Sequence, residues 1–189
     1  MSKNIVSSQI IEAEMLARKI LEVEPKNLDA LKGLGLVKLK QHLYDEAINL
    51  LKEAFELNPK DKEIKIKLIC ALELQAKQTA FTSQLPKSIE LIRYALKLEP
   101  FSSALLCRMS LLLSVSKNFI EALEFADRAL SIDKKSSEAF NMIGLALLGL
   151  QRLPEAEKKL LKSISLNPDS ASAYSNLSLV YRARGEYNK

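Results

Sequence analysis

The sequence of 189 residues contains no tryptophan, one histidine, two cysteines, five glycines and six prolines. Two cysteines, Cys70 and Cys107, are too few for a disulfide framework and are typical of a reducing compartment, so we expect a cytoplasmic protein. The single histidine, His42, excludes a histidine-rich metal site and a pair of catalytic histidines within this chain. Because turn-forming and β-branched residues are scarce and leucine is abundant, the composition favours helices over sheets.

Long apolar runs are also missing. No stretch reaches the roughly 18 residues that suggest a membrane span, and the N-terminus lacks the pattern of a signal peptide. The apolar share is nevertheless 48%, which is enough for a sizeable core. The net charge of +5 is too small for a nucleic-acid signature. We therefore expect a soluble protein that neither spans a membrane nor binds nucleic acid.

The chain repeats itself with a period of 34 residues. The segments that end in Pro25, Pro59, Pro100, Lys134 and Pro168 lie 34, 41, 34 and 34 residues apart. The same period aligns a column of small residues: Ala13, Ala47, Ser88, Ala122 and Ala156. Within each unit apolar residues recur at the three- and four-residue spacing of a helix, and proline ends the second helix. Each unit is therefore predicted to be a hairpin of two helices that approach closely through small side chains.

These columns resemble the tetratricopeptide repeat, whose period is 34 residues, with a small residue in the first helix (helix A), alanines in the second (helix B) and a closing proline. Residues 137–170 fit this pattern best, with Gly144, Ala156 and Pro168 at the expected places. Residues 62–102 depart most, with Ile69 in the glycine column and seven extra residues. The resemblance implies an all-α protein, a right-handed α-α superhelix (a solenoid) of helical hairpins.

The resemblance makes residues 1–189 a single array. Its parts are a lone helix B at 9–27, full repeats at 28–61, 62–102, 103–136 and 137–170, and helix A of an incomplete repeat at 171–189. The seven extra residues fall around Gln75 to Pro86. Either each helix there gains about one turn, with Ser83 capping the second helix, or the insertion forms a loop. Leu179 and Val180 give the last helix an apolar outer face, which predicts self-association through uncapped ends.

Patterns of catalytic residues are missing. The chain has no phosphate-cradling glycine loop, no Cys-x-x-Cys and no Gly-x-Ser-x-Gly. We expect His42, in the short turn between two helices, to be a surface residue. Cys70 and Cys107 are either small buried hydrophobic groups or a metal or redox pair. The sequence therefore predicts a protein that is not an enzyme and that needs no cofactor or metal.

Helix A lines the inner surface of tetratricopeptide arrays, and partners commonly bind there. By this resemblance the candidate groove residues are Lys32, Leu36, Lys67, Cys70, Arg108, Leu111, Asn141, Leu145, Asn176, Leu179 and Arg182. The column from Leu36 to Leu179 is apolar in every repeat, and the alternative is that its leucines pack between neighbouring A helices. The basic members are harder to bury and are expected to face solvent.

The prediction for function is a non-catalytic scaffold that binds a peptide or protein segment in this groove. Apolar burial along the leucine column would hold the ligand, and Lys32, Lys67, Arg108 and Arg182 would select an acidic one. The family's carboxylate clamp is matched here only at Arg108, and its asparagine ladder only at Asn176. The alternative is a targeting or regulatory region of a larger enzyme, of the transferase or phosphatase type, whose catalytic domain lies outside this chain.

Overall fold

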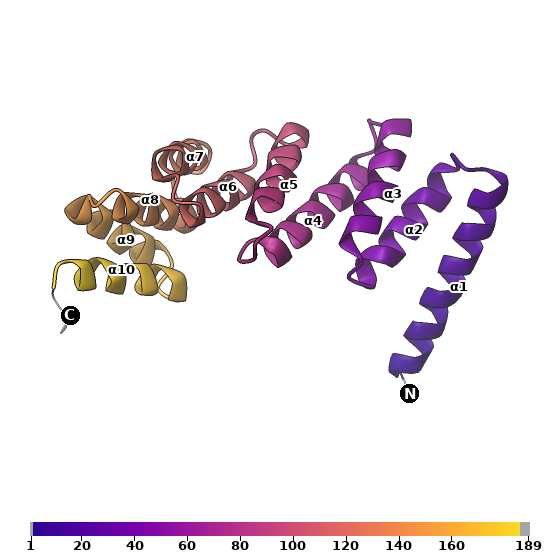
Figure 1. Ribbon diagram of the computed structural model, residues 1–189, viewed down its shortest axis with the longest axis horizontal. Coiled ribbons are helices and arrows are strands. Elements are labelled where there is room, and N and C mark those ends of the chain that lie inside the picture. Colours follow the sequence, from indigo (N-terminus) through magenta and orange to yellow (C-terminus); the bar gives the residue numbers. More distant parts are fainter. Residues whose placement is uncertain (1, 186–189) are drawn as a thin grey trace. The chain divides into compact units, whose positions relative to one another are not determined.

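The computed structural model describes residues 2–185, with the side chains of residues 10–185, and these residues form helices and no strand (Figure 1). The helices are α1 (Ser2–Val23), α2 (Leu28–Lys40), α3 (Tyr44–Leu57), α4 (Lys62–Thr79), α5 (Leu85–Leu98), α6 (Ser103–Val115), α7 (Phe119–Ile132), α8 (Ser137–Gly149), α9 (Leu153–Leu166) and α10 (Ala171–Ala183). The predicted all-α fold class is confirmed.

Three of the hairpins share one local design. Helix A has 13 residues in α2, α6 and α8, and helix B has 14 residues in α3, α7 and α9. An asparagine or serine caps helix A: Asn27, Ser102 and Ser136 each accept a hydrogen bond from the backbone N–H three residues later. Such caps satisfy N–H groups that the first turn of a helix leaves unpaired.

In three of the hairpins the turn from helix A to helix B contains a residue in the left-handed region. His42, Lys117 and Gln151 have φ values of 61°, 62° and 60°, and Gly185, which follows α10, has a φ of 77°. These four residues occupy the same place in their repeats. Left-handed φ lets the chain reverse within three residues, and only glycine adopts it without strain.

The two helices of a hairpin meet at small residues, as the sequence columns predict. A Cβ atom on Gly144 of α8 would lie 2.5 Å from Cγ of Leu160 on α9, which is far inside van der Waals contact. Ala122 and Ala156, near the start of their B helices, have no exposed surface. Close packing at these points buries the apolar stripe of each helix against its neighbour.

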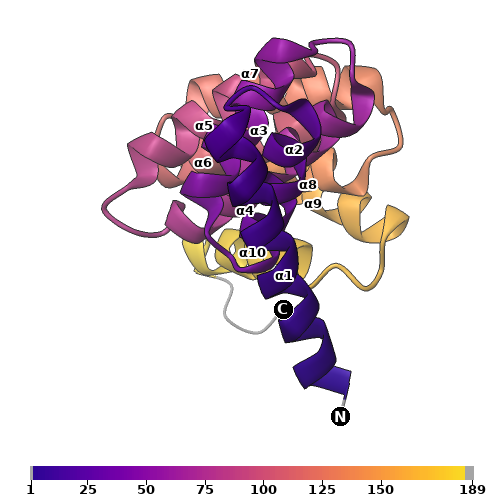
Figure 2. The same ribbon diagram turned by 90° about the vertical axis from the view of Figure 1, so that its right-hand side faces the viewer.

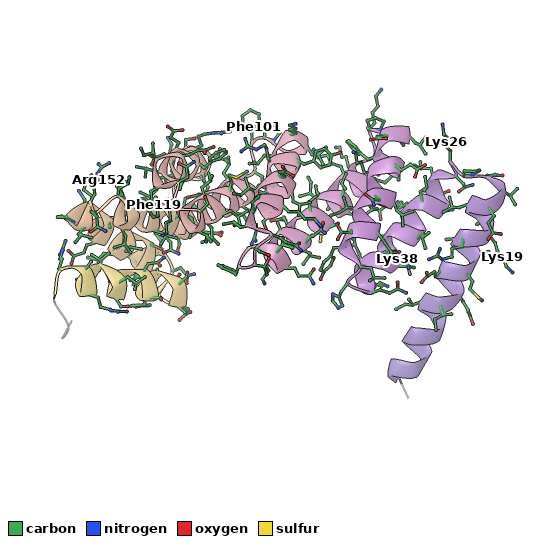
Figure 3. All side chains as sticks on the ribbon, in the orientation of Figure 1. Lys19, Lys26, Lys38, Phe101, Phe119 and Arg152 are labelled. Atoms are coloured by element: carbon green, nitrogen blue, oxygen red, sulfur yellow. The ribbon has the colours of Figure 1, made fainter. Side chains whose placement is uncertain are left out.

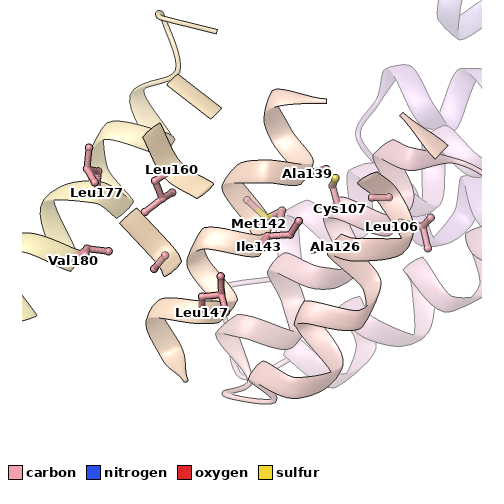
Figure 4. Close-up of a cluster of buried hydrophobic side chains, with 12 residues drawn as sticks. Leu106, Cys107, Ala126, Ala139, Met142, Ile143, Leu147, Leu160, Leu177 and Val180 are labelled. Carbon is pink, nitrogen blue, oxygen red and sulfur yellow. The ribbon is translucent and has the colours of Figure 1, made fainter. Parts of the chain in front are cut away.

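The chain divides into two compact units, of which one ends at Gln78 and the other begins at Thr79. In the first unit a core cluster of Leu31, Ala54 and Ile64 joins α2, α3 and α4. In the second unit a larger cluster runs from Leu106 on α6 to Val180 on α10 (Figure 4). Helices α8, α9 and α10 pack on one another there, and they lie close together in two perpendicular views (Figures 1 and 2).

The seven extra residues are divided unequally between helix and turn. Helix α4 has 18 residues against 13 in α2, whereas α5 keeps 14, so the first helix alone is longer. Ser83 does not cap α5, because the helix begins after Gln84 and has no side-chain cap. Thr82 shapes the turn instead: its hydroxyl donates to the carbonyl of Thr79 and accepts from the N–H of Gln84. Pro86 lies in the first turn of α5, as expected.

The last described helix corrects one expectation about the ends of the array. Val180, predicted to face outward, has no exposed surface and belongs to the core cluster of the second unit, because it lies on the face of α10 that packs inward. Leu179 has 39% of its surface exposed, as predicted. The expected apolar end is therefore reduced to Leu179.

Candidate functional site

A cleft of about 500 Å³ opens on the helix A side of the second unit, between α6, α8 and α10. It is lined by Leu111, Ser137, Glu138, Asn141, Met142, Leu145, Asn167, Ser170, Ser172, Ser175 and Asn176. Leu111, Met142 and Leu145 supply the apolar part of the lining. Met142 is buried, and the two leucines are half-buried. Met142 and Leu145 lie three residues apart on α8, so they share one face of that helix.

A hydrogen-bonded chain of amides and hydroxyls forms the polar part of the lining. The amide nitrogen of Asn141 donates to the Ser172 hydroxyl at 3.0 Å, and the amide nitrogen of Asn176 donates to Oδ1 of Asn141 at 2.9 Å. Asn141 has only 2% of its surface exposed, so these bonds fix its orientation. An asparagine amide has two donor hydrogens and an acceptor oxygen. The bond to Asn141 uses only one hydrogen of Asn176.

Charge is sparse in this cleft. Among the described residues that line it, Glu138 alone carries a charge. Arg108, although it lies on α6 less than one turn from Leu111, is half-buried and is not part of the lining. An arrangement of three apolar side chains beside amide and hydroxyl groups can hold a short segment with an apolar side chain and free peptide groups.

The cleft brings together four of the eleven predicted groove residues, namely Leu111, Asn141, Leu145 and Asn176. Three others of the second unit do not line it: Arg108 on α6, and Leu179 and Arg182, which are exposed on α10.

The remaining predicted groove residues lie on α2 and α4 of the first unit. Lys32 on α2 donates a hydrogen bond to, and forms an ion pair with, Glu63 on α4. This pairing raises the pKa of Lys32. Leu36 and Lys67 are half-buried, whereas Cys70 is exposed. Lys32 is therefore both partly exposed to solvent and paired with Glu63 within the protein.

A buried lysine in the first unit was not among the residues predicted from the sequence. Lys38 on α2, labelled in Figure 3, has 5% of its surface exposed. Its ammonium group lies 2.8 Å from Glu14 on α1 and 3.3 Å from Glu46 on α3. Hydrogen bonds from Lys38, Arg18 and Gln41 lower the pKa of Glu14 to about 2. The network joins three helices. Its signal in the sequence is that the corresponding positions in the next three repeats are all leucine.

The two cysteines and the histidine differ in exposure, because Cys107 is buried whereas Cys70 and His42 are exposed. Cys107 is buried, and burial raises the pKa of its thiol to about 12, as expected for a small hydrophobic core group. Cys70 is exposed, so the expectation of burial is wrong there. His42 is exposed, as predicted, with Nδ1 2.9 Å from the Tyr44 hydroxyl. Within residues 2–185 no group of three or more histidine, cysteine or acidic side chains could hold a metal ion.

None of the helices described is both long and apolar enough to cross a membrane.

Two family models of the tetratricopeptide repeat match the chain, one over residues 7–66 and the other over residues 141–189. Human Protein O-mannosyl-transferase TMTC1 is 26% identical over 179 residues, which are 93% of this chain and 19% of the transferase. The chain thus spans about a fifth of the length of that relative.

Solved structures share the fold. YrrB, described as a TPR protein with an unusual peptide-binding site, superposes with a TM-score of 0.66 and 20% identity, covering 91% of this chain and 86% of YrrB. The first TPR of Spaghetti (RPAP3), bound to the HSP90 peptide SRMEEVD, has a TM-score of 0.54 and 19% identity, covering 62% of this chain and 93% of the other. At these identities the likeness concerns the solenoid fold alone.

Proposed function

Because the chain is a tetratricopeptide-repeat protein, we propose that it is a non-catalytic scaffold that holds a segment of another protein in the cleft between α6, α8 and α10. The observation that carries this proposal is the composition of the cleft. Its volume of about 500 Å³ lies within the range of roughly 300–1,000 Å³ that is usual for ligand sites. Its lining combines an apolar surface with oriented amides.

The proposed mode of binding follows from the two kinds of lining. An apolar side chain of the ligand packs against Leu111, Met142 and Leu145, and removal of that surface from water supplies most of the affinity. The amide of Asn176 bonds a peptide group of the ligand and fixes its direction. Because Asn141 already holds Asn176 in place, little side-chain freedom is lost on binding.

Two solved relatives in fold support a peptide as the ligand. YrrB is described as having a peptide-binding site, and the first TPR of Spaghetti (RPAP3) is bound to an HSP90 peptide. Selection of an acidic ligand by Lys32, Lys67, Arg108 and Arg182 stays a prediction. Glu138 within the cleft favours a ligand whose buried part is neutral, so acidic residues would have to lie outside it, nearer Arg108 and Arg182. The cytoplasmic location expected from the cysteine content also stays a prediction.

Selection from a displayed library of random peptides tests the proposal. Peptides enriched on the whole chain should bind Leu145→Lys about tenfold more weakly or worse, because a charge would enter the apolar part of the cleft. They should bind Asn176→Ala more weakly too. The control is Lys158→Ala, an exposed position on α9. Peptides that bind Leu145→Lys and the wild type equally would place the ligand elsewhere and refute the proposal.

A second candidate function rests on the match to the human transferase, which covers 93% of this chain. In this alternative the repeats are the targeting or regulatory region of a larger enzyme, and the cleft selects its substrate protein. Sequencing of the complete transcript distinguishes the two. A catalytic domain in the same reading frame would favour the second candidate, and its absence would favour the separate scaffold.

A further inference from the structure

The A helices of successive repeats meet through pairs of residues that lie 31 residues apart in the sequence. In the first unit Lys32 on α2 forms an ion pair and a hydrogen bond with Glu63 on α4. In the second unit Asn141 on α8 donates a hydrogen bond to the Ser172 hydroxyl on α10 at 3.0 Å. Asn141 occupies the position of Lys32 in its own repeat, so the two pairs are equivalent contacts of the fold.

Glu138 belongs to a third pair of this kind, in which the partner carries no charge. By the same spacing Glu138 on α8 corresponds to Glu63, and Cys107 on α6 corresponds to Lys32. Cys107 and Ala139, the residue after Glu138, both belong to the core cluster of the second unit (Figure 4). Burial, and secondly the negative charge of Glu138, raise the pKa of the Cys107 thiol to about 12. Because a neutral thiol does not compensate a carboxylate, Glu138 lacks the cation that Glu63 has.

The carboxylate of Glu138 is accessible to a ligand. Glu138 is exposed and lines the cleft between α6, α8 and α10. Among the residues that the structure describes, none forms a hydrogen bond or an ion pair with this carboxylate. An acid in the first turn of α8 also complements the helix dipole. That interaction leaves both carboxylate oxygens able to accept hydrogen bonds from a ligand.

One face of α8 carries both this acid and apolar side chains of the cleft. Glu138, Met142 and Leu145 follow one another at spacings of four and three residues, so they lie along the same face of the helix. The helix rises about 1.5 Å per residue, which sets Leu145 roughly 10 Å beyond Glu138 along its axis. An extended ligand covers that length with about three residues, since it rises about 3.3 Å per residue.

We propose that the ligand of this cleft carries a lysine or arginine that pairs with Glu138, about three residues from the apolar side chain that packs against Met142 and Leu145. The inference rests on the proposed function and names the class of ligand, a segment with a basic residue close to an apolar one. The apolar side chain is its buried, neutral part, and the cation lies at the exposed edge of the cleft. The ion pair of Lys32 with Glu63 is the precedent for this contact within the same chain.

A double-mutant cycle with library peptides tests the pairing. A peptide enriched on the whole chain is made in two forms, one with its basic residue and one with glutamine in that place. Glu138→Gln should weaken binding of the basic form about threefold to fivefold, as expected for an ion pair at an exposed edge. It should leave binding of the glutamine form unchanged, because the coupling is then absent. Added salt should weaken the basic form more on the wild type than on Glu138→Gln.

The matched control is Glu124→Gln, which removes an exposed acid of α7 outside the cleft. Circular dichroism checks that each variant keeps its helix content and melting temperature. Enriched peptides without a basic residue would overturn the inference, and so would basic peptides that Glu138→Gln and Glu124→Gln weaken equally. If such peptides still lose affinity for Leu145→Lys, the proposed function stands and the cation alone is refuted. Peptides that bind Leu145→Lys and Glu138→Gln as tightly as the wild type would refute the cleft itself, and this inference with it.

Discussion

Two glycines in α2 provide a sharp test of the packing between the helices of a hairpin. A Cβ atom on Gly35 would lie 2.8 Å from Cγ and 3.0 Å from Cδ2 of Leu51 on α3. Leu51 has no exposed surface, so it has little room to move away. A Cβ atom on Gly33, only two residues earlier, would meet no atom within 4 Å. Alanine should therefore be rejected at Gly35 and accepted at Gly33.

The expected magnitudes follow from two effects of opposite sign. Replacement of glycine by alanine inside a helix stabilises it by about 1 kcal/mol, and this gain is common to both positions. Insertion of a methyl group into a packed core costs roughly 1–3 kcal/mol, and this cost arises only at Gly35. Gly33→Ala should thus raise the free energy of unfolding by about 1 kcal/mol. The helix term cancels between the two variants, so they should differ by the overpacking cost of roughly 1–3 kcal/mol.

Urea unfolding, followed by far-UV circular dichroism, measures this difference. Because both glycines lie in the same helix, both changes affect the stability of the same cooperatively unfolding part of the array. In the Gly35→Ala background, Leu51→Ala should cost less than it does in the wild type, since the clash is then relieved. Equal stabilisation by Gly33→Ala and Gly35→Ala would refute the close approach of α2 and α3 at this point.

The remaining predictions concern strain, burial and charge. Lys117→Gly and Gln151→Gly should each raise the melting temperature, with a gain of roughly 0.5–1 kcal/mol, because glycine adopts their left-handed φ of 62° and 60° without strain. Ser110→Ala should stabilise the protein by about 1 kcal/mol in urea unfolding, because its hydroxyl is buried without a partner among the described residues. The carboxylate of Glu14, with its pKa lowered from 4.5 to about 2, contributes stability above pH 4.5 that is lost as the pH falls towards 2. Glu14→Gln should make the melting temperature depend less on pH over that range.

The hairpins could be predicted because each packing position is sampled several times along the chain. A single alanine does not indicate a packing position. Ala122 and Ala156, however, occupy the same place in successive repeats, and neither has exposed surface. Burial of Val180 could have been found in the same way, since Val37, Ala71, Leu112 and Ala146 occupy its column and all are buried. The prediction for Val180 was wrong because its position near the end of the sequence suggests exposure, whereas its column in the repeat gives burial.

The insertion has no second copy to compare with, so its division between helix and turn could not be read from a column. Local propensity was the available signal. The segment from Glu73 to Lys77 is made of strong helix formers, which favours extension of α4. The turn depends on Thr82, whose hydroxyl bonds the backbone on both sides. Hydroxyl side chains form such bonds in many local geometries, so the sequence did not distinguish Thr82 from Ser83 as the residue that matters.

Whether a residue of helix A lines the cleft depends on how its side chain packs against the neighbouring helices. The 34-residue period does not give that packing. Arg108 and Leu111 lie within one turn of each other on α6, yet only Leu111 lines the cleft. Lys38 shows the opposite case, a charged residue buried at a leucine position because Glu14 and Glu46 compensate its charge. The type of residue therefore did not predict the environment of Arg108 or of Lys38, because the neighbouring helices determine it.

The column that contains both Cys70 and Leu145 shows why repeats with the same fold can differ in what they bind. Packing columns must keep small or apolar residues, because every hairpin closes on the same contacts. Columns on the groove side of helix A are free of that requirement, and their chemistry changes along the chain. At one and the same position in the repeat, Leu145 forms part of a cleft lined with amides, whereas Cys70 is exposed on α4. Membership in the repeat family therefore accounts for the scaffold, and the binding partners must be inferred from the groove positions at which the repeats differ.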